Sequence, residues 1–211
     1  MSGILIIGAG GHGKVVADIL LRQSMPVRGF LDDDPTTWGT LRLGLPVLGP
    51  IDTFSDYSPE GLAMGIGSNA LRQDVVKRLG TLAQELWQSA IHPRAILAPS
   101  AKIGRGTVIA AGAIVNPDAV VGEHVIINTG ATVDHDCRIG DFAHIAPGVH
   151  LAGGVRVGEG SLVGIGGSVI PGCNIGQWTT IGAGAVVVDD IPSHSVAVGV
   201  PARCINKEKA G

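Results

Sequence analysis

Aliphatic residues recur at every sixth position through the second half of the chain. The series begins at Ile91 and ends at Val187, and all 17 of its members are Ile, Leu or Val. Neither a helix, with a period of 3.6, nor a strand, with a period of two, produces this spacing. Four residues after each one comes a small or β-branched side chain, as at Ala95 and Ala185. An unbroken run of this length does not arise by chance.

Each hexapeptide is therefore predicted to form one short strand and one turn, with the aliphatic side chain pointing into a triangular prism. Three hexapeptides close one coil, and the coils stack as parallel strands. Gly often follows the aliphatic residue, as at Gly104 and Gly122, where it relieves the backbone at the turn. The pattern predicts an all-β, left-handed parallel β-helix of nearly six coils over residues 89–211.

The first half of the chain has a different pattern, which predicts alternating strands and helices. Strands are expected at 4–7, 27–31 and 61–67, a Gly-rich turn at 8–14, and helices at 15–21 and 69–79. Ser68 or Asn69 would cap the second helix. Strand, Gly-rich turn, helix and strand in this order predict a small, Rossmann-like α/β domain with a parallel sheet over residues 1–88.

Composition narrows the class of protein. Glycine accounts for 33 of 211 residues, aromatic residues for only 3%, and the net charge is −3 with both signs interspersed. This balance argues against a nucleic-acid or anionic-membrane partner. No membrane span, signal peptide, disulfide framework or zinc-finger spacing is recognised, because no apolar run reaches the length of a membrane span and the three cysteines are scattered. The expected location is the cytoplasm.

The Gly-rich turn matches the pattern G-x-G-x-x-G between a strand and a helix. It contains Gly8, Gly10, Gly11, His12 and Gly13. Such a loop directs backbone N–H groups and a helix N-terminus at phosphate. A tight turn without a ligand is the alternative. The domain is too short for a full dinucleotide fold, which favours a nucleotide sugar over NAD.

Two further residues are candidates for contact with this ligand. Asp32 follows the Gly-rich motif at the distance, about 20 residues, where an acid that binds ribose would stand. Asn69 follows a strand end that should face the ligand crevice, although helix capping explains it equally well. Arg72 is interpreted as an ordinary helix residue.

The most promising segment for catalysis is 128–137. His135 should point outward at a turn, flanked by Asp134 and Asp136. A carboxylate that binds one imidazole nitrogen fixes the tautomer and raises the basicity of the other nitrogen, which suits a general base. The alternative is an ordinary surface histidine. Gly153 comes one full coil after His135 and should lie directly over it, where its N–H could stabilise a developing oxyanion.

Other polar residues of the repeat are assigned by their positions. His144 and His150 occupy equivalent positions on neighbouring faces of the prism, where either could line a groove. Cys137 and Cys173 fall at the inward small position and are predicted to be core residues. No metal site is suggested by the ligand spacing.

These features together resemble bacterial sugar acyltransferases of the sialic acid O-acetyltransferase type, in particular the N-acetyltransferases that act on nucleotide-linked 4-amino sugars. The similarity extends over essentially the whole chain. It rests on IIGAGGHGKVV at 6–16, IHP at 91–93, INT at 127–129, VDHDC at 133–137 and GVPAR at 199–203.

The resemblance implies a homotrimer with active sites between neighbouring β-helices, a nucleotide sugar on the N-terminal domain, and acetyl-CoA as co-substrate. His135 resembles the family's base and Asp136 its acidic partner. Asn128 resembles the residue near the sugar amine. Contacts with acetyl-CoA are implied for four residues: His144, Gly153, Ile165 and Ala183.

The sequence leaves three rival functions open. The same His and Asp could serve O-acetylation of a sialic acid or a related sugar. The β-helix could be a non-catalytic trimeric scaffold or a sensor of nucleotide sugars. It could also be a metal-dependent carbonic anhydrase, with His135, His144 and His150 as ligands, although the Gly-rich N-terminal domain argues against that. The sugar, the nucleotide and the acyl chain length are not fixed by the sequence.

Overall fold

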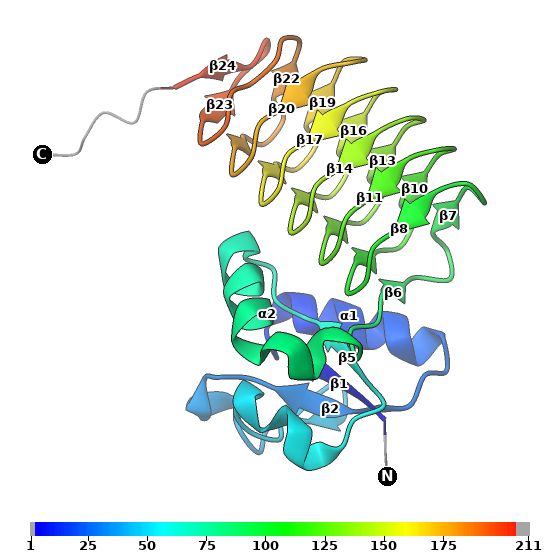
Figure 1. Ribbon diagram of the computed structural model, residues 1–211, viewed down its shortest axis with the longest axis vertical. Helices are drawn as coiled ribbons and strands as arrows, with labels where there is room; N and C mark the ends of the chain where they lie inside the picture. The colour runs from blue at the N-terminus through cyan, green and yellow to red at the C-terminus, as the bar shows by residue number, and fades with distance from the viewer. Residues whose placement is uncertain (1–2, 206–211) are drawn as a thin grey trace, which may run out of the picture.

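The computed structural model describes residues 3–205, in which a small α/β domain stands at one end of a long β-helix (Figure 1). The α/β domain contains a parallel sheet in the order β2–β1–β5, made of β1 (Ile4–Ile7), β2 (Val27–Leu31) and β5 (Gly61–Met64). Every residue of β1 and β5 is buried, which explains why both read as continuous apolar runs. The three expected strands are therefore present, the last of them ending at Met64.

Helices and short elements surround this sheet. Helix α1 (Gly11–Arg22) follows β1, and helix α2 (Asn69–Gln84) follows β5. Ser68 is the N-cap of α2, because its hydroxyl accepts a hydrogen bond from the N–H of Leu71 at 3.5 Å. Between β2 and β5 lie four short elements: η1 (Pro35–Thr37), the antiparallel pair β3 (Leu41–Arg42) and β4 (Leu45–Pro46), and η2 (Ile51–Tyr57).

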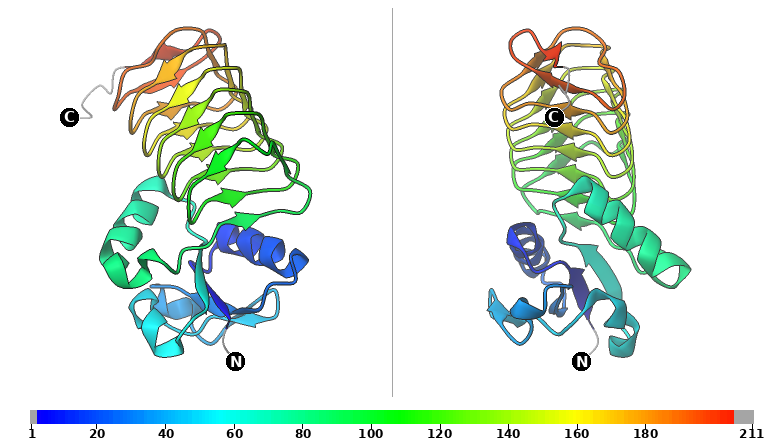
Figure 2. Two further views of the ribbon diagram at one scale, coloured as in Figure 1. Left: turned by 45° about the vertical axis from the view of Figure 1, so that its right-hand side comes forward. Right: turned by 90° about the vertical axis from the view of Figure 1, so that its left-hand side faces the viewer.

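The β-helix has three faces, each a stack of short strands that are parallel except for the last strand of the first face (Figure 2). The first face contains β6 (Ala90–Ile91), β9 (Val108–Ile109), β12 (Ile126–Ile127), β15 (His144–Ile145), β18 (Leu162–Val163), β21 (Thr180–Ile181), β23 (Val196–Val198) and the antiparallel β24 (Arg203–Cys204). The second face contains β7 (Ile96–Leu97), β10 (Ile114–Val115), β13 (Thr132–Val133), β16 (His150–Leu151), β19 (Ser168–Val169) and β22 (Val186–Val187). The third face contains β8 (Lys102–Ile103), β11 (Val120–Val121), β14 (Arg138–Ile139), β17 (Arg156–Val157) and β20 (Asn174–Ile175).

Neighbouring strands on each face are one coil apart in sequence, as in the pairing of Thr132 with His150. The four-residue turns between faces form three edges. The first edge joins the first and second faces, the second edge joins the second and third, and the third edge joins the third and first. The third residue of most turns adopts the left-handed conformation, with φ of 66° at Gly130, 60° at Asp136 and 58° at Phe142. Gly carries no steric cost there, which explains its frequency in the repeat.

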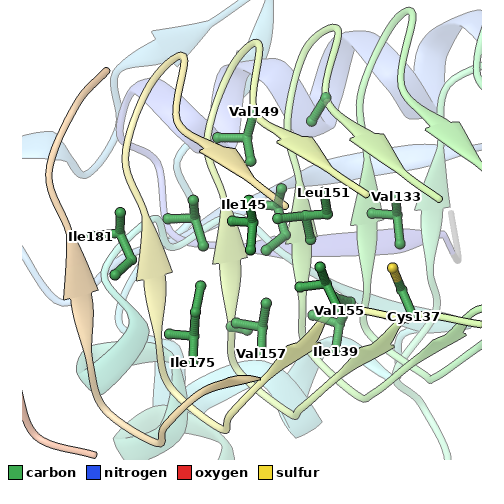
Figure 3. Close-up of a cluster of buried hydrophobic side chains, with 14 of the residues drawn as sticks. Val133, Cys137, Ile139, Ile145, Val149, Leu151, Val155, Val157, Ile175 and Ile181 are labelled. Atoms are coloured by element: carbon green, nitrogen blue, oxygen red, sulfur yellow. The ribbon is translucent and has the colours of Figure 1, made fainter. Parts of the chain in front are cut away.

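The interior of the prism is the main core of the protein. The aliphatic residues of the six-residue series and the small residues four positions later form one continuous cluster (Figure 3). Cys137 is completely buried and Cys173 is 6% exposed, as expected for core residues. The predicted fold class, a small parallel α/β sheet followed by a parallel β-helix, is confirmed.

The N-terminal domain packs against the first face of the β-helix. Val108 and Ile126 point outward from that face and yet are only 1% exposed, and Val108 belongs to the same apolar cluster as Ile4 and Val16. Helix α2 reaches further along the β-helix than α1 does (Figures 1 and 2). None of the helices within residues 3–205 combines the length and apolarity needed to cross a membrane.

Candidate functional site

The second edge carries an ordered His–Asp pair. His135 follows β13 in the turn, and its Nδ1 lies 2.8 Å from Oδ2 of Asp136. The backbone N–H of His135 donates to Oδ1 of Asp134 at 2.8 Å, and the side chain of Asn116 donates to the same oxygen at 3.0 Å. Asp136 has a left-handed backbone, and the turn that contains it holds the carboxylates of Asp134 and Asp136 by hydrogen bonds. The outward orientation predicted for His135 is present, since its side chain is 61% exposed.

This geometry sets the chemistry of the imidazole. A carboxylate only accepts hydrogen bonds, so the proton of neutral His135 lies on Nδ1 and the lone pair lies on Nε2. The hydrogen bond that His135 donates to Asp136, followed by the charge of Asp134, raises the pKa of His135 above its ordinary value. In its neutral form, His135 therefore presents the basic lone pair of Nε2 to solvent.

Gly153 lies against the ring of His135, as the coil register predicts. A methyl group built on Gly153 would lie 2.5 Å from Cε1 and 2.6 Å from Nε2 of His135. The N–H of Gly154 donates to the carbonyl oxygen of His135 at 2.9 Å, which ties the two coils together. The N–H of Gly153 itself donates to no other group within residues 3–205. The edge thus combines a base with a neighbouring backbone donor.

A second cluster lies at the first edge, where the β-helix meets the N-terminal domain. Nδ2 of Asn128 lies 3.1 Å from Nε2 of His144, and Oδ1 of Asn128 accepts a hydrogen bond from the N–H of Thr129 at 2.8 Å. Burial, with smaller effects of the Arg72 and His12 charges, lowers the pKa of His144 to about 3. His144 is therefore neutral at physiological pH.

His12 adds a further buried imidazole to this cluster. Burial, followed by the charge of Arg72, lowers the pKa of His12 to about 4. Its Nε2 is buried and has no hydrogen-bond partner among the described residues. A buried polar atom without a partner is unusual in a folded protein and marks a place where a ligand could bind. The cluster thus joins the Gly-rich loop to the first edge.

The Gly-rich loop has the close packing that its glycines allow. Gly8 has φ of 102°, and a methyl group on Gly13 would lie 2.1 Å from the carbonyl oxygen of Gly8. The N–H of Ala9 donates to Oδ2 of Asp32 at 2.6 Å, and the N–H of Asp34 donates to Oδ1 at 2.9 Å. Asp32 therefore holds the loop with Oδ2 and the turn after β2 with Oδ1. A contact between Asp32 and ribose remains a prediction.

A cavity of about 280 Å³ opens beside this loop. Its lining includes Gly10, Gly11, Lys14 and Arg42, together with Asp32. Lys14 and Arg42 were not singled out from the sequence, although Lys14 directly follows the Gly-rich motif. A second cavity, of about 490 Å³, shares Gly11 and Lys14 with the first and extends to Thr129 beside Asn128. The two cavities form a path from the loop to the first edge.

In the structure, Asn69 connects helix α2 to the β-helix, and its contact with substrate stays a prediction. Its Nδ2 donates to the carbonyl oxygens of Gly160 at 3.0 Å and Ser161 at 3.2 Å, while its Oδ1 accepts a hydrogen bond from Arg72 at 3.0 Å. Both ends of the amide are thus occupied in docking α2 onto the β-helix. The cap of α2 is Ser68.

The remaining predicted residues lie along the first edge. Ile165 is 61% exposed and stands two coils beyond Thr129. Ala183 stands one further coil along, where the N–H of Gly184 donates to the carbonyl of Ile165 at 2.8 Å. Ile165 and Ala183 thus share an edge with Asn128, while His135, Asp136 and Gly153 lie on the second edge. Within one chain, a full face of the prism separates the two groups.

His124 was not recognised from the sequence, and it has the same electrostatic character as His12. It is 2% exposed, its ring stacks on Phe142 at 5.4 Å, and Trp87 packs edge-on at 4.8 Å. Its Nδ1 is buried without a partner among the described residues. Burial, followed by the charge of Arg72, lowers its pKa to about 4.

Burial of His124 predicts acid sensitivity. Its folded pKa is lower than the unfolded value near 6.5, so the unfolded chain binds more protons as the pH falls from about 6.5 to about 4, and stability is lost over that window. In His124→Phe, the free energy of unfolding should fall less between pH 7 and pH 4 than in the wild type, by up to about 3 kcal/mol. Urea unfolding at each pH measures this difference. His194→Phe, at an exposed position on the same edge, is the control, and an equal change in the two variants would contradict the prediction.

No group of three or more His, Cys, Asp or Glu residues within 3–205 is arranged to hold a metal ion. The carbonic anhydrase alternative needs three histidines that converge between subunits; within one chain, His144 is on the first face, His150 on the second face and His135 at the second edge. The structure combines a β-helix, a histidine with a raised pKa on its second edge, and a Gly-rich loop of the phosphate-binding type near its first edge. This combination is typical of a hexapeptide-repeat acyltransferase with an N-terminal ligand-binding domain.

Comparisons with known proteins agree with this class. Residues 3–79 match the family model described as the PglD N-terminal domain, and residues 118–153 match the bacterial transferase hexapeptide (six repeats) model. The perosamine N-acetyltransferase of Caulobacter crescentus, solved with CoA and GDP-perosamine, is 42% identical over 98% of both chains, with a TM-score of 0.90. The acetyltransferase domain of PglB from Neisseria gonorrhoeae, solved with acetyl coenzyme A, is 37% identical over 96% of this chain and 98% of that one, with a TM-score of 0.87.

The curated relatives are matched over part of their length. UDP-N-acetylbacillosamine N-acetyltransferase of Bacillus subtilis is 41% identical over 122 residues, which is 53% of this chain and 52% of that protein. An uncharacterised protein of Acanthamoeba polyphaga mimivirus is 33% identical over 106 residues, or 21% of its length. With its near-complete match to the Caulobacter and Neisseria structures, the chain belongs to the family of hexapeptide-repeat N-acetyltransferases of nucleotide-linked amino sugars.

Proposed function

We propose that this protein transfers the acetyl group of acetyl-CoA to the C4 amine of a nucleotide-linked 4-amino-deoxy sugar. The observation that carries the proposal is the His135–Asp136 pair, whose free Nε2 lies over Gly153, in a chain 42% identical throughout to an enzyme solved with CoA and GDP-perosamine. We place the reaction in the cytoplasm, where nucleotide sugars and acetyl-CoA are made.

The nucleotide diphosphate would occupy the cavity beside the Gly-rich loop. Backbone N–H groups at the start of α1 and the cationic side chains of Lys14 and Arg42 suit the negative charge of a diphosphate. The adjoining cavity leads to Thr129, so the sugar would extend toward Asn128 and His144. These two groups, with the neutral His12, offer uncharged hydrogen-bonding partners to a polar sugar substituent.

The transfer is proposed to be direct, without a covalent enzyme intermediate. Nε2 of His135 accepts a proton from the amine as the amine nitrogen bonds to the thioester carbon. Asp136 stabilises the imidazolium, and the N–H of Gly153 donates to the oxyanion that develops on the carbonyl oxygen. When the C–S bond breaks, the departing sulfur takes up the proton held by the imidazolium of His135, which leaves an amide, a free thiol and neutral His135. Alignment of both substrates in one groove supplies the entropic part of the rate acceleration.

We further propose that the active site is shared between subunits of a homotrimer. The proposed base, His135, lies on the second edge. Asn128, His144 and the Gly-rich loop of the N-terminal domain lie at the first edge, one prism face away. A second copy that brings its second edge against the first edge of its neighbour would complete the site. Acetyl-CoA would then lie along this groove, beside Ile165 and Ala183.

The test is release of CoA when the purified protein is mixed with acetyl-CoA and a panel of nucleotide-linked 4-amino sugars. Each amino sugar is paired with its 4-hydroxy counterpart, and CMP-sialic acid is included. Turnover with an amino sugar alone is expected. Turnover with the hydroxyl compounds alone would replace the proposal by O-acetylation, and no turnover with any compound would overturn it in favour of a non-catalytic role.

The raised pKa of His135 predicts the pH profile. Only neutral His135 can accept a proton, so the acid limb of kcat/KM should lie above the pH expected for an ordinary histidine. Asp136→Asn removes the hydrogen-bonded carboxylate that raises this pKa. The acid limb of kcat/KM should therefore move to lower pH. The plateau value of kcat should fall about tenfold, because the imidazolium of His135 loses the carboxylate that stabilises it. A profile recorded from pH 5 to pH 9 measures both changes, and Asp118→Asn, at the equivalent position one coil earlier, is the control.

A further inference from the structure

Arg72 is the largest completely buried side chain of the protein, although the sequence indicates an ordinary helix residue. It projects from the first turn of α2 and is 0% exposed. No carboxylate within residues 3–205 forms an ion pair with it. Burial lowers its pKa to about 10, so it still carries its charge at neutral pH. Burying an unpaired charge is costly, which calls for a compensating interaction.

The compensation comes from carbonyl oxygens of both domains. On the N-terminal side, Nη1 donates to the oxygens of Gly67 at 2.8 Å and Ile66 at 3.3 Å. On the β-helix side, Nε donates to the oxygen of His124 at 3.0 Å, and Nη2 donates to that of Phe142 at 2.7 Å. His124 and Phe142 occupy equivalent positions in consecutive coils on the third edge. The guanidinium therefore holds two successive coils at once.

Neighbouring side chains of α2 extend the same contact. Asn69 donates to the carbonyl of Gly160, one coil beyond Phe142, and accepts a hydrogen bond from Nη2 of Arg72. Gln73 donates to Oε1 of Glu159 at 2.6 Å. Residues three and four positions apart share one face of a helix, so a single face of α2 follows the third edge over three coils.

This contact lies directly behind the Gly-rich loop. Gly67, whose oxygen accepts from Arg72, packs near His12, since a methyl group on Gly67 would lie 3.7 Å from Cβ of His12. His12 in turn belongs to the cluster of Asn128 and His144 at the first edge. The contacts of Arg72 thus connect the Gly-rich loop, through Gly67 and His12, to the backbone of the β-helix.

We propose that Arg72, supported by Asn69, is a positioning residue that fixes the Gly-rich loop of the N-terminal domain against Asn128 and His144 of the β-helix. It acts through the backbone of both domains and touches no substrate. The planar fork of a guanidinium has five donors in a fixed geometry, which an ammonium group or an apolar side chain cannot reproduce. The proposal deepens the proposed function and depends on it for the kinetic part of its test.

The kinetic test compares Arg72→Met, Arg72→Lys and Asn69→Ala with Arg78→Met as control. Arg78 lies on the same helix and pairs on the surface with Asp33 and Asp52. For Arg72→Met, kcat/KM for the amino sugar should fall at least about tenfold per folded protein, with the KM for acetyl-CoA unchanged. Arg72→Lys, which keeps the charge without the fork, should recover only part of that loss, and Asn69→Ala should lose less than Arg72→Met.

Hydrogen exchange provides a readout that does not depend on activity. In Arg72→Met, amide exchange should accelerate in residues 8–14 and in α2, while residues from 164 onward, beyond the coils that α2 contacts, keep wild-type rates. These exchange rates test the positioning role of Arg72 even if the wild-type protein transfers no acetyl group. A failure of this inference can therefore be told apart from a failure of the proposed function. Exchange like that of Arg78→Met, full recovery by Arg72→Lys, or a loss of activity that matches the loss of folded protein would each overturn the inference.

Discussion

Replacement of His135 by Asn is expected to lower kcat by about 10²- to 10⁴-fold, the range that a positioned general base contributes. Asn can occupy the space and donate a hydrogen bond to Asp136, but it cannot accept a proton at neutral pH. The side chain is 61% exposed and packs into no core. The thermal midpoint should therefore stay within about 1 °C of the wild type, because surface substitutions change stability little. Steady-state kinetics and calorimetry on the same preparation measure the two quantities.

The matched control is His150→Asn. His150 is also an exposed histidine of the β-helix, it stands on the second face, and its Nδ1 lies 2.9 Å from the hydroxyl of Thr132. Its replacement should leave kcat within about twofold. The proposed role of His135 would be lost if kcat fell equally in both variants, or if the His135 variant kept wild-type kcat at every pH.

The fold could be predicted almost completely because the sequence pattern that specifies it is repeated along the chain. The six-residue series specifies strand, turn and inward position 17 times, and each repeat supports the same register. The coil length then placed Gly153 over His135 without further information, and the structure confirms that contact. Local periodicity is sufficient here because each strand pairs with the one at a fixed distance in sequence.

The parts of the site that depend on contacts between domains could not be predicted. From the sequence, Asn69 is a candidate for substrate contact or for a helix cap, and Arg72 is an ordinary helix residue. Nothing in a helical pattern shows which face will meet a β-helix much further along the chain. In the sequence, the residues on either side of His124 are those of an ordinary turn of the repeat. Its burial results from Trp87, which precedes the β-helix and packs against it.

Gly153→Ala is expected to lower kcat about 10²-fold while the fold is retained. The new methyl group would lie 2.5 Å from Cε1 of His135, a distance that the structure cannot accommodate, so the imidazole must move. The ring is exposed and can swing outward at little cost, which leaves the coils intact. A displacement of about 1 Å from the productive position is enough for a loss of this size. The measurement is kcat, together with the thermal midpoint.

A double-mutant cycle separates displacement of the base from damage to the coil. If Gly153→Ala acts through the ring, the same substitution in the His135→Asn background should cost less than about twofold, because no base remains to be displaced. The full loss in both backgrounds would mean that the methyl group acts elsewhere, on the backbone donor or on the groove itself. Strong non-additivity would therefore identify Gly153 as the residue that sets the position of the imidazole. The 18-residue coil is the feature of the sequence that places Gly153 over His135.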